Sequence, residues 1–383
     1  MRVQKLRDDS GLRFLLLDGE GVEVTAVSDF LRHLRARGSS PNTLSAYAYD
    51  LLHFFRFLAG ASITYREFSP RRALDLLEYL RDVSARGRAR KSGAEVSGGD
   101  EAQFARLSPV TVNRILAAVS SFYEHLILTG NTSQDENPLR KVPDLAASRV
   151  TPRYVPFLHL TSRQRPVRRA VRVRAPQRLP RPLTDEQVMA LFGSFTRLRD
   201  RAIFLLMLQG GLRPGEALGL HLEDVQYGRR RVVVRCRFDH PKGVRTKSRV
   251  ERVVDLHEPE ALAAVSAYVM RERPSDASTP HLFLVGGHRA GRLEPLGYSA
   301  LAKLFRRYCR KASLEEPWVT PHALRHTHAT RMWEGGMREL TLQKRLGHAS
   351  PESTRLYTRV SDSAMLEDYH RALRKNSGEE GEE

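Results

Sequence analysis

Several short segments in the second half of the 383-residue chain carry side chains suited to chemistry on a phosphate. The first, GLRPGE at 211–216, places Arg213 directly before a proline that favours the first turn of a helix. A guanidinium held at such a rigid start is suited to two parallel hydrogen bonds with a phosphate. Taken alone, Arg213 is better explained as an ordinary surface arginine, so the argument depends on the other segments.

A second group lies at the start of another predicted helix. Thr320 is expected to cap this helix and Pro321 to begin it, which places His322 and Arg325 on one face. The first turn of a helix favours anions because of its unpaired N–H groups and its dipole. A phosphate is therefore expected where His322 and Arg325 both point.

Three further residues complete the candidate set. Lys247 lies between two predicted strands, where a lysine on a turn can reach into a cleft and deliver a proton. His348 follows a glycine typical of a helix end, and Ser350-Pro351 begins a new helix that carries Tyr357. A lysine in so basic a chain is usually solvated, and a tyrosine at this spacing is usually part of a core. Only their combination indicates catalysis.

The charge of the chain points to a polyanionic partner. It contains 63 Lys and Arg against 44 Asp and Glu, which gives a net charge of +19 and a pI near 10.4. A field of this size attracts nucleic acid, which is the first partner to consider. The alternative that charge alone leaves open is a ribosomal protein or a merely basic protein from an arginine-rich proteome.

Metal and disulfide frameworks are not expected. Cys236 and Cys309 lie far apart in sequence, and both are expected to be reduced and structural. His326 and His328 raise the question of a metal, but no carboxylate or cysteine stands nearby at ligand spacing. We therefore expect no metal site and no cofactor.

The first part of the chain is expected to hold a hairpin and a helical domain. Alternating apolar residues around a turn predict a hairpin or arm over 1–23. From 24 to 136 the pattern becomes helical, and Ser40 and Ser108 each precede a proline that starts a helix with a long apolar stripe. Between these helices, 85–106 is rich in Gly, Ser and charge and is expected to be a flexible insertion.

A basic linker is expected over 137–182. From 139 onward it carries twelve Arg or Lys against one acidic residue, Asp144, with several prolines and little periodicity. Such a run is usually a solvated segment. In a basic protein it is also suited to lie along phosphates.

The second domain is expected over 183–372. Thr184 and the glutamine three residues later form a capping box at its first helix. Alternating apolar residues at 231–237 and 249–256 predict a small antiparallel sheet, and the remainder is helical. An acidic tail over 373–383 is expected to be disordered. The fold class is thus mainly α with a small antiparallel β-sheet, an α+β arrangement.

The order and spacing of these segments resemble the active-site set of the tyrosine recombinases of the phage integrase family. Most of the chain takes part in this resemblance, because the SPNT helix start at 40–43 is similar to the family's helical core-binding domain and 183–370 to its catalytic domain. The HALRHTHAT segment at 322–330 is similar to transposase-type members. The residues that the resemblance identifies are Arg213, Lys247, His322, Arg325, His348 and Tyr357.

The resemblance implies a metal- and ATP-independent enzyme that cleaves and rejoins DNA. Tyr357 would be the nucleophile of a 3′-phosphotyrosine intermediate, while Arg213 and Arg325 hold the non-bridging phosphate oxygens. It further implies that His322 handles the tyrosine proton and that Lys247 protonates the 5′-hydroxyl leaving group. His348 would donate a hydrogen bond to the phosphate.

Two details depart from the usual family pattern. Pro214-Gly215 stands where many relatives have another pair before the glutamate, although Arg213 itself is in place. The lysine is also ambiguous, because Lys242 lies near the same turn and Arg249 or Arg252 is easily confused with it. Lys247 is preferred because RVVDL at 252–256 follows it as the next strand follows the family's lysine.

The resemblance also implies the setting in which the protein works. Expected partners are double-stranded DNA and further copies of the chain, a dimer on each site and a tetrameric synapse, with accessory factors in some reactions. No signal peptide or membrane span is predicted, which favours the bacterial cytoplasm. The main interpretation is integration, excision or transposition of a mobile element. The alternatives are a chromosome-dimer resolvase, a type IB topoisomerase or a catalytically silent DNA-binding protein.

Overall fold

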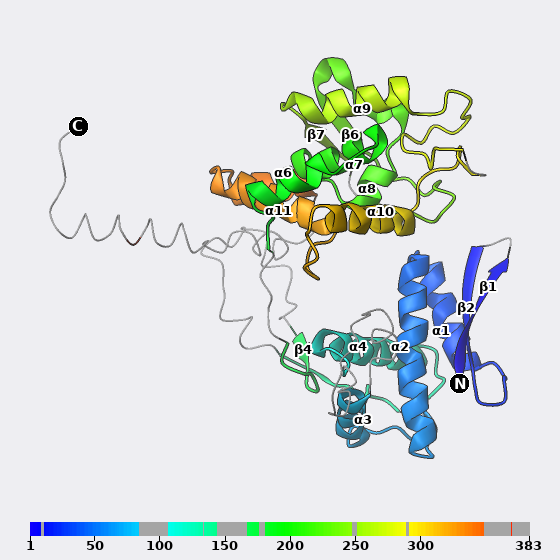
Figure 1. Ribbon diagram of the computed structural model, residues 1–383. Helices are drawn as coiled ribbons and strands as arrows, with labels where there is room; N and C mark the ends of the chain where they lie inside the picture. Colours follow the sequence, from blue (N-terminus) through cyan, green and yellow to red (C-terminus); the bar gives the residue numbers. More distant parts are fainter. Residues whose placement is uncertain are drawn as a thin grey trace, which may run out of the picture. The chain divides into compact units, whose positions relative to one another are not determined.

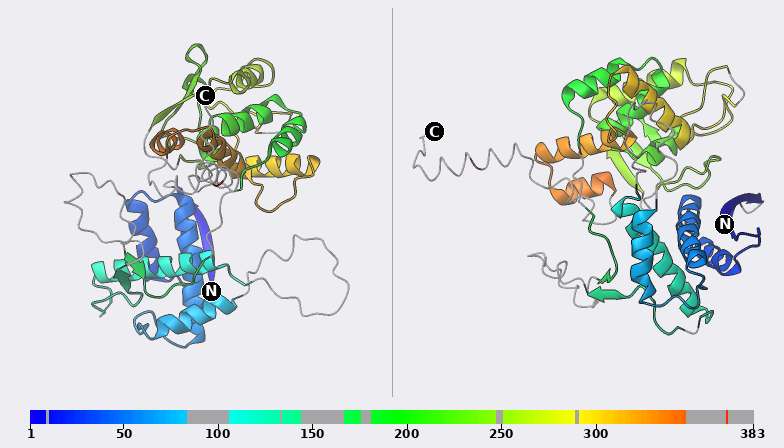
Figure 2. Two further views of the ribbon diagram at one scale, coloured as in Figure 1. Left: turned by 90° about the vertical axis from the view of Figure 1, so that its left-hand side faces the viewer. Right: turned by 60° about the horizontal axis from the view of Figure 1, so that its bottom comes forward.

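A computed structural model describes most of the chain in two compact units. The described residues are 1–8, 11–83, 106–132, 134–143, 167–175, 181–246, 251–288, 291–347 and 369. The first unit comprises Met1–Gln177 and the second Arg178–Glu383 (Figures 1 and 2). Each unit buries its own apolar core.

The first unit begins with the predicted hairpin, which the structure confirms. Strands β1 (Arg2–Asp8) and β2 (Gly11–Leu17) pair antiparallel, with Arg2 opposite Leu17 and Asp8 opposite Gly11. The hairpin packs against α2 through β2. The helices of this unit are α1 (Thr25–Ala36), α2 (Pro41–Gly60), α3 (Arg72–Asp82) and α4 (Pro109–Leu128).

The two long helices of this unit begin as the sequence predicts. The Ser40 side chain accepts a hydrogen bond from the Thr43 backbone N–H at 3.1 Å, and the Ser108 side chain accepts one from Thr111 at 3.3 Å. In both helices proline occupies the first turn, where it has no N–H to leave unpaired. Helices α2 and α4 pack together around an aromatic core that includes Phe122.

The expected linker contributes ordered structure to the first unit. Strands β3 (Lys141–Pro143) and β4 (Val167–Arg169) pair antiparallel within 137–182. Asn113 on α4 exchanges two hydrogen bonds with the Val173 backbone, at 2.8 and 2.9 Å. The described residues 137–143 and 167–175 of this basic segment therefore belong to the helical unit. The expected insertion over 85–106 lies outside the described residues except for Arg106.

The second unit is built around α7. Figure 1 shows this helix among its neighbours, and it packs against α8, α9 and α11. Its residues 202–208 are all apolar and buried, as expected for a helix segment in the middle of a core. The helices of the unit are α6 (Asp185–Gly193), α7 (Leu198–Gln209), α8 (Pro214–Leu218), α9 (Pro259–Arg271), α10 (Tyr298–Lys311), α11 (Pro321–Glu334) and α12 (Glu339–Leu346).

A small antiparallel sheet completes this unit, as predicted. Its strands, in spatial order, are β5 (Val225–Gln226), β6 (Arg231–Val234) and β7 (Arg252–Asp255). Val232 and Val234 turn inward on β6 and Val254 on β7, so one face of the sheet joins the core. The segment 235–251 connects β6 to β7.

Three local predictions in this unit have mixed outcomes. The capping box at Thr184 is confirmed, because its side chain and that of Gln187 exchange hydrogen bonds with each other's backbone. Gly347 ends α12 in the left-handed conformation, with a φ of 63°. The prediction that Thr320 caps α11 is wrong in part. Thr320 occupies the position before the helix, but its side chain makes no capping hydrogen bond and only its carbonyl accepts one, from Ala323.

Candidate active site: an arginine cluster around Glu216

Glu216 on α8 is the centre of a buried cluster of arginines from different parts of the second unit. Its side chain is fully buried, and three guanidinium groups surround it. They belong to Arg213 before α8, Arg252 on β7 and Arg325 on α11. A buried carboxylate requires such compensation, because burial without paired charges is strongly unfavourable.

Arg252 makes the two-pronged contact with Glu216. Its Nη1 and Nη2 donate to the two carboxylate oxygens at 2.9 and 2.7 Å, and its Nε donates to the carbonyl of Arg345 at 2.9 Å. The guanidinium thus joins β7, α8 and the end of α12. Because it is buried and uses the fork geometry that only arginine offers, Arg252 serves the site by positioning other groups.

Arg213 is held from both of its ends. Its backbone N–H donates to Glu216 at 2.8 Å, and Nη1 of its side chain donates to the same carboxylate at 2.8 Å. Nη1 and Nη2 also reach the carbonyls of Leu346 and Gly347, at 3.4 and 3.2 Å. The side chain keeps 17% of its surface exposed. Arg213 is therefore fixed in direction and still accessible to a ligand.

Arg325 reaches the same place from α11. Its Nη1 donates to the carbonyl of Gly211 at 2.6 Å, and its Nη2 donates to the carbonyl of Leu346 at 2.6 Å. Nη1 also lies 3.6 Å from Glu216, and the side chain is 3% exposed. The structure thus brings Arg213 and Arg325 together at the C-terminal end of α12, where both contact the carbonyl of Leu346.

The charge state of Glu216 follows from these contacts. Burial by itself raises the pKa of this carboxyl, but the hydrogen bonds and charge of Arg252, with the charges of Arg325 and Arg213, outweigh it and lower the pKa to about 2. Glu216 is therefore ionised at neutral pH. One negative charge among three positive ones leaves the cluster with a net positive charge, which suits an anionic ligand.

A second layer of contacts fixes the end of α12. His328 on α11 donates from Nδ1 to the carbonyl of Leu208 at 2.8 Å and accepts at Nε2 from the Nε of Arg345 at 3.0 Å. Both ring nitrogens are engaged, and burial, with the charge of Arg345, lowers the pKa of His328 to about 3. The hydrogen bonds of this neutral histidine give it a structural role.

Of the predicted site residues, three are described and three are not. Arg213 and Arg325 lie together, and His322 lies exposed in the first turn of α11, one turn before Arg325. Lys247, His348 and Tyr357 fall outside the described residues. Their described neighbours are Thr246 at the end of the segment after β6, and Gly347, whose carbonyl accepts from Arg213.

The structure bears on the choice of lysine. Lys242 pairs with Glu294 at 3.0 Å, and Arg252 is committed to Glu216. Both are thereby engaged in structural contacts, which favours Lys247 among the alternatives. The assignment of Lys247 stays a prediction.

Comparison with known proteins identifies the family. The pattern of the phage integrase family matches residues 181–364, and that of the phage integrase N-terminal SAM-like domain matches residues 27–96. Tyrosine recombinase XerD of Mycobacterium tuberculosis is 30% identical over 354 residues, covering 88% of this chain and 94% of that protein. The chain belongs to the tyrosine recombinase family.

Other relatives of this tyrosine recombinase extend over nearly its whole length. Transposase A from transposon Tn554 of Staphylococcus aureus is 28% identical and covers 98% of this chain and 99% of that protein. Among solved structures, the Tn1549 transposon integrase in complex with circular intermediate DNA has a TM-score of 0.57 at 18% identity and covers 90% and 99% of the two chains. XerH bound to difH DNA has a TM-score of 0.58 at 18% identity and covers 87% and 81%. These structures establish the shared fold.

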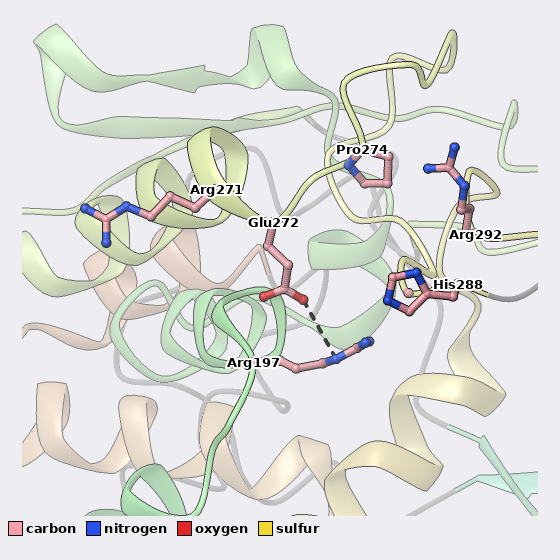
Figure 3. A pocket seen from close by; sticks show the side chains of 7 residues that line it. Arg197, Arg271, Glu272, Pro274, His288 and Arg292 are labelled. Atoms are coloured by element: carbon pink, nitrogen blue, oxygen red, sulfur yellow. Dashed lines mark ion pairs between the residues drawn. The ribbon is translucent and has the colours of Figure 1, made fainter.

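A pocket elsewhere in the recombinase does not belong to this site. It has a volume of ≈ 480 Å³ and is lined by Arg197, Arg271, Glu272, Pro274, Gly287, His288 and Arg292. Figure 3 shows Arg197 directed at Glu272, and their Nε and Oε1 atoms lie 3.9 Å apart. Glu272 also accepts from the backbone N–H of Arg199, in the first turn of α7. The pocket therefore lies at the N-terminal end of α7, whereas the arginine cluster lies beyond its C-terminal end.

Sequence reasoning missed the parts of the site that hold the arginines. Glu216 was visible only as the last letter of the GLRPGE segment, and Arg252 only as a rival for the lysine. A conspicuous signal for Glu216 was its place three residues after Arg213, which is the spacing of a helix-start capping contact. Nothing in the sequence pattern linked Arg252 to Glu216.

Among the described residues, none of the helices has the length and the apolar character needed to cross a membrane.

Proposed function

We propose that this chain is a site-specific DNA recombinase that breaks and rejoins DNA strands through a covalent 3′-phosphotyrosine link to Tyr357. The observation that carries the proposal is the cluster around Glu216. It brings Arg213 and Arg325 to the end of α12, two residues before His348 in the sequence. A positively charged cluster with a partly exposed guanidinium is suited to a phosphodiester.

Electrostatics explains why such a cluster is needed. A tyrosine has a pKa of about 10, so its ionisation at pH 7 costs roughly 4 kcal/mol unless nearby cations offset it. The attacked phosphate also gains negative charge in the transition state. In the proposed mechanism Arg213 and Arg325 serve both needs by binding the non-bridging oxygens.

The remaining roles follow from the family. His322, exposed at the first turn of α11, would take the proton from Tyr357. Lys247, on the segment between β6 and β7, would protonate the departing 5′-oxygen. His348 would donate a hydrogen bond to the phosphate. The tyrosyl oxygen forms one ester bond as the 5′ ester bond breaks, so the link conserves the bond and rejoining needs no ATP.

Arginine also takes the place that metal ions have in many nucleases. Guanidinium groups neutralise the non-bridging oxygens, so the cleavage step itself needs no divalent ion. We place the recombinase on double-stranded DNA in the bacterial cytoplasm, as a dimer on each site and a tetramer in the synapse. Two of the solved structures similar to it are, by name, complexes with DNA.

Movement of a mobile element is the favoured biological role. Similarity to the Tn554 transposase spans 98% of this chain and 99% of that protein. Similarity to XerD is slightly higher in identity but covers 88% of the chain. The second candidate, resolution of chromosome dimers, shares the chemistry and differs in the DNA site.

The test compares wild type with Tyr357→Phe on nicked DNA that carries the flanks of the gene. A nick near the cleaved bond lets the short fragment that carries the free 5′-hydroxyl diffuse away. The covalent complex is then trapped because the strand cannot be rejoined. We expect a protein–DNA species that survives denaturant with wild type alone. DNA binding should be similar for the two proteins, because the change removes one hydroxyl.

The contradicting outcomes are distinct. A covalent species with Tyr357→Phe would show that the nucleophile is another residue. DNA binding without any covalent species, on the gene's flanks and on a broad fragment library, would make the chain a silent binder. Loss of cleavage in EDTA, with DNA binding, tryptophan fluorescence and melting temperature all unchanged, would contradict the metal-free assignment of roles.

A further inference from the structure

Two buried histidines of the second unit lie side by side on neighbouring backbone segments. His221 and His281 are paired in an isolated antiparallel bridge, flanked by a 2.8 Å hydrogen bond from Leu282 to Leu220 and a 3.0 Å bond from Leu222 to Pro280. Their ring centroids lie 4.6 Å apart. Since the backbone fixes both residues, the proximity of the two imidazoles is built into the fold.

A carboxylate completes the group. The Asp239 oxygens lie 3.2 Å from Nε2 of His221 and 4.0 Å from Nε2 of His281. The three ligand atoms all lie within 4.8 Å of one another. Ligands at about 2.0 Å from a tetrahedral zinc ion are roughly 3.3 Å apart, so the pair of His221 and Asp239 already has this spacing and the widest pair must close by at most roughly 1.5 Å.

The Nε2 nitrogens of the two rings lie beside the Asp239 carboxylate without forming a hydrogen bond to it. His221 and His281 are 6% and 4% exposed, and within the described ranges nothing forms a hydrogen bond with the Nε2 atom of either ring. His240 lies next to them, 4.9 Å from His281 between ring centroids, and its buried Nε2 is in the same position. Buried polar atoms normally have partners, so this concentration points to a ligand.

The surroundings also orient the rings as in a metal site. Nδ1 of His281 lies 2.9 Å from the Thr279 hydroxyl, and with Nδ1–H as the donor the Nε2 lone pair faces Asp239. Buried Asp224 accepts from the His221 backbone N–H at 2.8 Å and binds Arg237 on the segment that carries Asp239. The Asp224 carboxylate therefore holds both His221 and the segment that carries Asp239 in place.

We propose that His221, His281 and Asp239 bind a divalent transition-metal ion, Zn²⁺ in the first instance. Two imidazoles and one carboxylate form a typical zinc ligand set. The ion is structural: no step of the cleavage reaction passes through it. Its binding joins the segment after β6 to the two backbone segments that hold His221 and His281.

A metal ion at this position would restrict the movement of the connection between β6 and β7. Asp239 lies on the 235–251 connection between β6 and β7, the segment that also carries Lys247. An ion at the group would fix the first half of this connection to the body of the unit. The metal would thereby stabilise the segment that carries Lys247.

The experiment uses tag-free, full-length protein without DNA, so its result does not depend on catalysis. Metal content is measured by mass spectrometry after purification, and Zn²⁺ and Co²⁺ are titrated into chelator-treated protein. We expect about one Zn²⁺ per chain, a rise in melting temperature with Zn²⁺, and the visible absorption of tetrahedral Co²⁺.

Matched variants locate the site. Asp239→Asn keeps the size of a half-exposed side chain and is expected to weaken Zn²⁺ binding at least roughly tenfold. His281→Gln should do the same, and His257→Ala, at an exposed histidine of the same unit, should bind Zn²⁺ like wild type. Near-ultraviolet circular dichroism verifies that each variant is folded.

Two results would overturn the proposal. One is wild-type protein with neither stoichiometric metal nor any response to Zn²⁺ or Co²⁺, which would make the group a hydrated histidine cluster. The other is undiminished Zn²⁺ binding by folded Asp239→Asn and His281→Gln proteins, which would place the metal elsewhere. Neither result depends on whether Tyr357 forms a covalent link to DNA.

Discussion

Both units of the recombinase contain buried carboxylates beside arginine, and two of these carboxylates, Asp50 and Glu216, have opposite properties. Asp50 on α2 contacts a single guanidinium, that of Arg114 at 2.7 Å, whose side chain is half exposed. Burial raises the pKa of Asp50 to about 6, and the charge of Arg114 offsets only part of this. Glu216 is surrounded by three arginines, and its pKa is lowered to about 2.

The difference shows what a buried charge requires. One solvated cation does not replace the hydration that Asp50 loses, whereas three converging guanidiniums more than replace that of Glu216. Glu216 is consequently an anion at neutral pH, and Arg213, Arg252 and Arg325 are arranged around it. Asp50 is an ordinary buried acid of the helical unit. Changes matched between the two sites test this contrast.

The largest effect is expected for Glu216→Gln. The neutral amide leaves three guanidiniums without their counter-charge, which should lower the free energy of unfolding of the second unit by about 3–5 kcal/mol. Both tryptophans, Trp318 and Trp333, lie in this unit, so their fluorescence in urea reports its unfolding alone. Glu223→Gln is the matched control, since Glu223 is exposed and should contribute less than about 1 kcal/mol. Equal losses would refute the central place of Glu216.

The pH dependence of the same unit should follow Glu216. Its pKa in the folded state lies below the ordinary value, so its contribution is fully present above about pH 4.5 and is lost as the pH falls towards 2. The difference between 4.5 and about 2 corresponds to about 3 kcal/mol. The stability gap between wild type and Glu216→Gln should therefore narrow from pH 6 to pH 3. A gap that stays constant with pH would contradict the assigned charge state.

Alanine substitutions at Gly130 in the first unit and Gly347 in the second compare how tightly atoms pack around the two helix ends. Gly130 and Gly347 end helices with φ values of 66° and 63°, but a Cβ on Gly130 meets no described atom within 4 Å, whereas one on Gly347 lies 2.8 Å from Nη1 of Arg252. Gly130→Ala should cost only the left-handed strain, about 1 kcal/mol. Gly347→Ala should cost about 1–2 kcal/mol more, because Glu216 prevents Arg252 from moving aside. Urea unfolding measures both, and a smaller cost at Gly347 would show that the cluster is loose.

The smallest effect is expected for Asp50→Asn. Its pKa is raised in the folded state, so its stabilising contribution is present below about pH 3.8 and is lost as the pH rises through about 6. Asparagine is neutral throughout, so the variant should be more stable than wild type by about 1 kcal/mol at pH 8 and by less at pH 5. Circular dichroism follows the first unit, with tryptophan fluorescence as the internal control for the second. Destabilisation at pH 8 would mean that the pair with Arg114 is worth more than its burial costs.

What the sequence could predict depended on how far a contact reaches along the chain. The caps at Ser40, Ser108 and Thr184 were predictable because each bond spans three residues. The hairpin and the β6–β7 pair were predictable from alternation around turns. Thr320 resembled the other caps, but its side-chain bond does not form in the structure.

Contacts between distant segments could not be read in this way. Arg252 and Glu216 are 36 residues apart, and their pairing depends on where β7 passes α8. The sequence raised the question of a metal site at His326 and His328 because these histidines lie two positions apart. The histidines with unengaged nitrogens, His221 and His281, come together only through a backbone bridge. Periodicity and local motifs contain no information on such encounters.

The most direct test of the Glu216 cluster is the cleavage rate of Arg252→Lys beside that of Arg114→Lys. Each change replaces an arginine that binds a buried carboxylate, Glu216 in one unit and Asp50 in the other. Single-turnover formation of the covalent complex is measured at saturating nicked DNA, with melting temperature and DNA affinity determined in parallel.

A lysine at position 252 cannot make the two-pronged contact that fixes Glu216 and, through it, Arg213. The account predicts that Arg252→Lys slows cleavage by roughly tenfold to a hundredfold while DNA affinity changes little, and that Arg114→Lys cleaves at the wild-type rate. Wild-type cleavage by a folded Arg252→Lys protein would contradict the claim that the buried carboxylate positions the phosphate-binding arginine.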